Sequence, residues 1–161
     1  MAAIAQPQQP DLRAFIVYDH VTAGCVPHLI TNNDTAPLLH PGDVVLIDTT
    51  DRQPAAELFL IRWATGALNL VQLYSRELDL MEPDQSTKRS KVWFCAAFNR
   101  PRTQAAWKAA FEQGYAVGMS DGPYRAEGPG SEYLRSKLVG RVVGILSVAN
   151  AEPMRQIGRA A

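Results

Sequence analysis

The stretch ELFLIRWATGALNLVQLY, residues 57–74, decides the fold of this 161-residue chain. Two apolar runs flank a three-residue loop that ends at Gly66, a pattern that predicts an antiparallel β-hairpin. Side chains alternate between the two faces of a strand, so Gln72 shares a face with Leu70 and Leu68.

Further strands are predicted on both sides of this hairpin. The sequence PGDVVLID, residues 41–48, is a tight turn followed by an apolar run too short for a helix, which indicates a buried strand. Gly140 and Gly144 allow bending or close backbone approach in a long C-terminal strand. The expected fold class is mostly β (β-rich α+β) and antiparallel, with one or two short helices. The other expected strands are 13–18, 92–98 and 138–148.

One helix is clearly signalled. Thr103 can cap a helix over residues 104–113 that stops at Gly114. Trp107 and Phe111 lie one turn apart on this helix, and we expect that face to pack against the domain. We expect a loop in the polar stretch before residue 92. The loop is expected at 82–91. We therefore predict a disordered Gln/Pro-rich tail at 1–11, one domain at 12–150 and a C-terminal tail at 151–161.

Charge and hydropathy exclude several classes of protein. Lys plus Arg and Asp plus Glu both total 16, so the net charge is zero and there is no broad positive field for nucleic acid. A neutral chain also meets little electrostatic resistance to self-association. The N-terminus lacks the pattern of a signal peptide, and no stretch approaches the roughly 20 apolar residues of a membrane helix. We expect a cytoplasmic protein without a membrane partner.

Three pieces, in order, resemble the LexA/phage-repressor family of self-cleaving peptidases. Residues 34–37 and 41–48 resemble the family's Ser-Met-x-Pro, then Gly-Asp and an apolar strand that ends in Asp. The hairpin 57–74 resembles the next strand pair, and 139–144 resembles the Gly-Arg-Val strand that closes the domain. The resemblance covers about residues 30–75 and 138–148 and implies a LexA/signal-peptidase-like antiparallel β-domain.

The family's chemistry uses a serine nucleophile and a neutral lysine base. On this resemblance Asp34 stands at the serine position and Gln72 at the lysine position. The chain has no serine before Ser75 and no lysine before Lys88, so neither group can come from this region. The resemblance implies a catalytically degenerate domain, which we expect not to be an enzyme and in which Asp34 and Gln72 lie close together. The vestigial binding groove would contain Asn33, Asp34, Thr35, Pro37 and Gln72.

Other interpretations of these residues stay open. Asp34 either pairs with Gln72 or caps an Asx turn, and a hydrolase of non-standard chemistry would use Asp34, His40 and Asp43. No set of four closely spaced ligands is evident, so we expect no metal and no cofactor. His20, Cys25 and His28 are weighed as metal ligands, and Lys88, Arg89 and Lys91 form a small basic cluster. A Gly/Pro-rich stretch is either a lid over a binding site or an ordinary surface loop, and it contains Asp121, Tyr124, Arg125, Glu127 and Tyr133.

The sequence thus favours an interaction or regulatory role, of the kind found with phage or stress-response genes. We expect a homodimer whose interface includes part of the β-surface at 138–148, or a partner peptide in the groove. A small ligand-binding domain is the alternative, and direct nucleic-acid binding is not expected.

Overall fold

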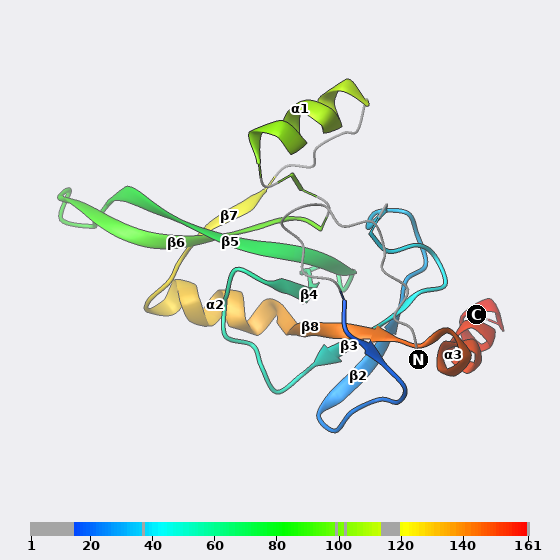
Figure 1. Ribbon diagram of the computed structural model, residues 1–161. Coiled ribbons are helices and arrows are strands. Elements are labelled where there is room, and N and C mark those ends of the chain that lie inside the picture. Colours follow the sequence, from blue (N-terminus) through cyan, green and yellow to red (C-terminus); the bar gives the residue numbers. More distant parts are fainter. Residues whose placement is uncertain (1–14, 37, 99, 102, 114–119, 161) are drawn as a thin grey trace.

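The computed structural model describes residues 15–36, 38–98, 100–101, 103–113 and 120–160. Within them lie one eight-stranded, mostly antiparallel sheet and three short helices (Figure 1). The predicted β-rich α+β class is confirmed. The tail expected at 1–11, and Pro37 of the expected groove, lie outside the described residues.

The strand order is β2-β3-β8-β4-β5-β6-β7, and β1 pairs in parallel with the end of β8. All other neighbours are antiparallel. The elements are β1 Val17–Tyr18, β2 Cys25–Leu29, β3 Val44–Asp48, β4 Leu58–Arg62, β5 Leu68–Met81, β6 Thr87–Ala97, α1 Gln104–Glu112, β7 Asp121–Arg125, α2 Pro129–Lys137, β8 Leu138–Leu146 and α3 Val148–Ala160.

The hairpin predicted at 57–74 is confirmed. Leu60 of β4 lies opposite Leu70 of β5, and the two strands are antiparallel over their whole shared length. The strand predicted after Gly42 is β3, in the same sheet. Side chains from β3, β4 and β5 alternate between faces, so each of these strands contributes to two apolar clusters.

The strand predicted at the C-terminal end is β8, in the interior of the sheet. It pairs with β3 on one side and with β4 and β1 on the other. A Cβ atom on Gly140 would collide with the carbonyl oxygen of Asp48, and one on Gly144 with the carbonyl oxygen of Ile16. The close approach expected at both glycines is therefore present. β8 offers no free edge, which removes our reason for placing a dimer interface on it.

Three apolar clusters form the core. The first lies between the sheet and α2 and contains Phe59, Ile61, Val71, Leu73, Trp93, Cys95, Tyr124, Leu134 and Leu138. The second lies on the opposite face of β4 and β5, where β3 and the loop before it close over Leu60, Leu70 and Phe98. The third lies under α3 and is built on Val44, Leu46, Leu146 and Ala151.

The prediction of a loop over residues 82–91 is wrong. β6 begins at Thr87, and only the tight turn before it is irregular. Asp79 lies opposite Arg89 and pairs with it at 3.4 Å, and Glu77 lies opposite Lys91. Alternating opposite charges across the two strands make a polar sequence compatible with a β-ribbon, which extends away from the body of the sheet (Figure 1).

The helix predicted after Thr103 is confirmed as α1, and the Thr103 hydroxyl accepts a hydrogen bond from the Ala106 amide at 3.1 Å. Its expected packing is wrong, because Phe111 is 84% exposed and no residue of α1 is buried. The Arg100 guanidinium, 5.6 Å from the centre of the Trp107 ring, is one contact between α1 and the rest of the chain. Gly114 lies outside the described residues.

Two helices come without a sequence prediction. α2 begins at Pro129 and buries Ser131 and Leu134 against the first cluster. α3 takes in most of the segment 151–161 that we expected to be a tail. Ala151 and Met154 pack in the third cluster, and this burial stabilises the helix.

Candidate functional site

Gln72, at the position expected for a lysine, is a buried structural residue. Its side chain is 3% exposed. Its amide nitrogen donates to the carbonyl oxygens of Ala97, Phe98 and Arg100 at 3.2, 3.0 and 2.9 Å. Two amide hydrogens are shared among three acceptors, so Gln72 holds the turn that leads the chain out of β6.

Asp34, at the position expected for the serine, lies exposed on the loop between β2 and β3. Its backbone N–H donates to Asn32 Oδ1 at 3.1 Å, so the Asx turn of this loop is capped by Asn32. The Asp34 carboxylate has no hydrogen-bond or ion-pair partner among the described residues, and it is not bonded to Gln72. Neither structural role considered for Asp34 is present.

Thr35, next in the loop, turns inward. It is 4% exposed, and its hydroxyl donates to the carbonyl oxygen of Leu39 at 3.2 Å. Asn33 is exposed, as Asp34 is. Leu39 packs in the second cluster with Leu70 and Phe98, so the loop and Gln72 border the same cluster. Of the expected groove residues, Thr35 and Gln72 are thus buried and bonded to main-chain carbonyl oxygens, whereas Asn33 and Asp34 are exposed.

The other residues that we weighed as ligands or surface groups lie as follows. Within the described ranges there is no group of three or more His, Cys, Asp or Glu side chains suited to a metal ion. His40 is exposed, and its backbone N–H donates to Asp43 Oδ2 at 2.8 Å, so Asp43 shapes the turn before β3. Burial lowers the pKa of His28. Lys88, Arg89 and Lys91 lie on β6 and project from the strand rather than from a loop.

A polar cluster at the end of α2 contains one residue that sequence reasoning missed. The Lys137 ammonium donates to the Tyr124 hydroxyl at 2.8 Å, and that hydroxyl donates to the carboxylate of Asp121. Lys137 also lies over the rings of Trp63 and Tyr133, 5.6 and 4.5 Å from their centres. Asp121, Tyr124 and Tyr133 belong to the stretch that we weighed as a lid, but Lys137 joins them only because α2 returns to the sheet.

Burial and the hydrogen bond to Asp121 raise the pKa of Tyr124 to about 12, although the Lys137 ammonium opposes the shift. Cys95 lies opposite Asp121 in the sheet, and burial raises the pKa of its thiol to about 12. Both groups are therefore neutral at physiological pH, and neither supplies an ionised nucleophile.

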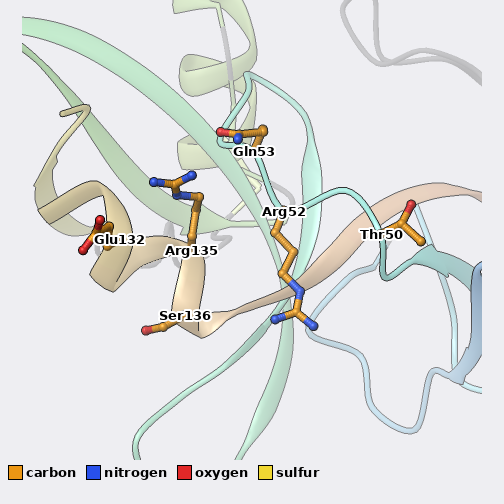
Figure 2. A pocket seen from close by; sticks show the side chains of 6 residues that line it. All are labelled: Thr50, Arg52, Gln53, Glu132, Arg135 and Ser136. Atoms are coloured by element: carbon orange, nitrogen blue, oxygen red, sulfur yellow. The ribbon is translucent and has the colours of Figure 1, made fainter. Parts of the chain in front are cut away.

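A cavity of about 440 Å³ lies on the α2 side of the molecule (Figure 2). Its lining residues come from the loop after β3 and from α2, which lie roughly 80 positions apart in the chain. No local sequence pattern predicts that these residues meet. They are all polar or charged: Thr50, Arg52, Gln53, Glu132, Arg135 and Ser136.

Comparison of the chain with protein-family models, with curated proteins and with solved structures found no match. In the described part of the chain, no helix has the length and apolar character needed to cross a bilayer.

Proposed function

We propose that this chain is a non-catalytic domain of the LexA/phage-repressor peptidase type, and that it acts in regulation by self-association. The observation that carries the proposal is the hydrogen bonding of Gln72. All of its amide donors are directed to main-chain carbonyl oxygens of the turn after β6. A glutamine in this position cannot take up a proton at neutral pH, so the chain lacks a general base where the resemblance requires one.

The nucleophile position supports the same proposal. Asp34 is an exposed carboxylate with no hydrogen-bond or ion-pair partner among the described residues. Thr35 has a hydroxyl, but that hydroxyl is buried and donates within its own loop. Neither residue forms the bonded nucleophile–base pair that covalent catalysis needs.

Exposed apolar side chains near the N-terminal end of the described chain support self-association. Ile16, Val17, Val21 and Val26 are all exposed. Val17 lies in β1 and Val26 in edge strand β2, whereas Ile16 precedes β1 and Val21 lies between the two strands. Exposed apolar side chains this close in sequence favour an interaction surface here. Pro27 in β2 has no N–H to donate to an added strand, which disfavours continuation of the sheet into a second copy. Side-chain packing across a two-fold axis therefore suits this surface better.

Two measurements test the proposal. Sedimentation equilibrium from low to high micromolar concentration should show a monomer–dimer equilibrium, and Val26→Asp should shift it toward monomer. Met81→Asp is the matched control, because Met81 is exposed and is the last residue of β5, opposite Thr87 at the turn of the β5–β6 ribbon. A monomer at every concentration, or equal effects of both variants, would refute self-association through this surface.

Mass spectrometry tests the absence of catalysis. The purified chain should keep its full mass during prolonged incubation at alkaline pH, where active relatives are expected to cleave themselves. A discrete fragment that disappears in Asp34→Ala would establish the alternative, a hydrolase built around Asp34.

A further inference from the structure

We propose that the cavity between the β3–β4 loop and α2 binds a small organic diphosphate. The proposal shares no residue with the groove around Gln72 or with the apolar surface of β1 and β2. It therefore stands or fails separately from the proposed function.

The first argument is the state of the arginines. Nine arginines have described side chains, and six of them contact a carboxylate, a carbonyl or an aromatic ring, namely Arg76, Arg89, Arg100, Arg125, Arg141 and Arg155. Among the described residues, Arg52, Arg62 and Arg135 have no such contact. Two of these three line the same cavity. Guanidinium groups without an internal partner are the usual means of binding phosphate.

The carboxylates closest in sequence to Arg52 are already engaged. Asp51 pairs with Arg141 at 3.0 Å. Asp48 accepts from the Thr50 hydroxyl at 2.6 Å, a bond that helps to lower the pKa of Asp48. Glu132 is the one acidic residue of the lining. The cavity therefore keeps an excess of one positive charge.

The backbone that carries the two arginines is held in place. The Asp48–Thr50 and Asp51–Arg141 interactions fix the loop that carries Arg52. Arg135 follows Leu134, which is fully buried and anchors α2 on the sheet. A backbone that is already held in place loses less conformational entropy when a ligand binds.

The positions of the two arginines and the size of the cavity indicate which kind of anion fits. Figure 2 shows Arg52 on the loop after β3 and Arg135 on α2, with their guanidinium groups pointing in different directions. Two separated cations suit a ligand with two charged groups better than a single small ion. The volume of about 440 Å³ lies in the range of small-molecule sites, roughly 300–1,000 Å³.

The remaining groups indicate an organic portion with hydroxyl groups. The Thr50 and Ser136 hydroxyls donate to Asp48 and to the carbonyl oxygen of Tyr133, so they are left as acceptors. Glu132 is an acceptor too, whereas Gln53 can donate. The two arginines and Gln53 would hold the phosphates, and the acceptors would hold ligand hydroxyls.

Isothermal titration at low ionic strength tests the proposal, with adenosine diphosphate, inorganic diphosphate and orthophosphate as probes. Wild type should bind both diphosphates saturably, and orthophosphate at least about tenfold more weakly. Arg52→Gln and Arg135→Gln should each weaken diphosphate binding about tenfold or more, the usual effect of losing a charged hydrogen bond. Arg62→Gln is the matched control, because Arg62 is exposed, has no partner in the described part of the chain and is not among the lining residues of the cavity. It should leave binding unchanged.

Glu132→Gln should change the affinity for diphosphate in the opposite direction from the two arginine variants. Removing its negative charge should tighten the binding of inorganic diphosphate, which has no hydroxyl for Glu132 to hold. The arginine variants lose no hydrogen bond or ion pair to another described residue, so their melting temperatures should match wild type. Three results would overturn the proposal: no saturable diphosphate binding at millimolar concentration, equal weakening by Arg62→Gln, or tighter arginine-dependent binding of an oligothymidylate than of either diphosphate.

Discussion

The side-chain nitrogen of Gln72 donates a 3.0 Å hydrogen bond to the carbonyl oxygen of Phe98, so a residue in β5 fixes the main chain just beyond the end of β6. The bond lies beside Leu70 and Phe98 in the second apolar cluster. A polar side chain at this depth is stabilising only while its donors are matched.

Replacing Gln72 by alanine should destabilise the fold by about 2–4 kcal/mol. The reason is that buried carbonyl oxygens lose their donor, at roughly 1–3 kcal/mol each, and part of this loss is recovered through relaxation or water. Urea denaturation followed by circular dichroism measures the change. Gln104→Ala is the control, because Gln104 is exposed on α1, and it should change stability by less than about 0.5 kcal/mol. Equal effects would remove the structural role assigned to Gln72.

Tyr124 should make stability depend on alkaline pH. Its pKa rises from an ordinary 10.0 to about 12 in the folded chain, first because of burial and then because it donates to Asp121. The folded state therefore holds the phenolic proton more tightly than the unfolded state. The resulting stabilisation is complete below pH 10 and is lost as the pH rises toward 12.

The measurement compares wild type with Tyr124→Phe at several pH values between 9 and 12. Cys95 shifts in the same direction, and its contribution cancels in this difference. The stability difference between the two proteins should shrink as the pH rises, and absorbance at 295 nm should show one tyrosine fewer titrating near 12 in the variant. A difference that is constant with pH would contradict the bond to Asp121.

The two cysteines should differ sharply in reactivity. Cys95 is 2% exposed, and burial raises its pKa to about 12, whereas Cys25 is partly exposed on edge strand β2. The thiolate is the reactive form, so a disulfide reagent at pH 8 should modify Cys25 first and Cys95 only after unfolding. Counting released chromophore with and without urea measures this, and Cys25→Ala should abolish the early phase. Equal rates for both thiols in the native protein would show that Cys95 is accessible.

Adding a methyl group at Gly144 should disrupt the sheet. The new Cβ atom would collide with the carbonyl oxygen of Ile16 and lie 2.5 Å from the Tyr18 ring. We expect Gly144→Ala to cost about 3 kcal/mol or more, because main chain must move. Gly66→Ala is the matched control. Gly66 has a positive φ of 85° but nothing within 4 Å of a new Cβ, so only backbone strain of about 1 kcal/mol is added. Thermal denaturation separates the two effects, and a milder result at Gly144 would contradict the close approach of β1 to β8.

Local patterns predicted several elements well. The β4–β5 hairpin, β3, β8 and the capped start of α1 follow from apolar runs, Gly66 and Thr103, all of which act within a few residues. The same reasoning failed for the polar part of β6. This part of β6 pairs along its length with β5, where Asp79 and Glu77 face Arg89 and Lys91. The sequence of a strand does not indicate which strand will pair with it. It failed again at Phe111, because an apolar stripe on a helix does not ensure that another element covers it.

The sequence by itself determined that this chain is β-rich and that residues 1–74 contain neither a serine nor a lysine for a Ser–Lys dyad. Only the tertiary structure decided that Gln72 bonds the turn after β6, that Lys137 meets Tyr124, and that Arg52 and Arg135 line one cavity. The physical reason is the range of the interactions. Propensity and patterning act within one strand or turn, whereas each of these sites joins segments about 13 to 80 residues apart that meet only when the sheet and α2 have packed.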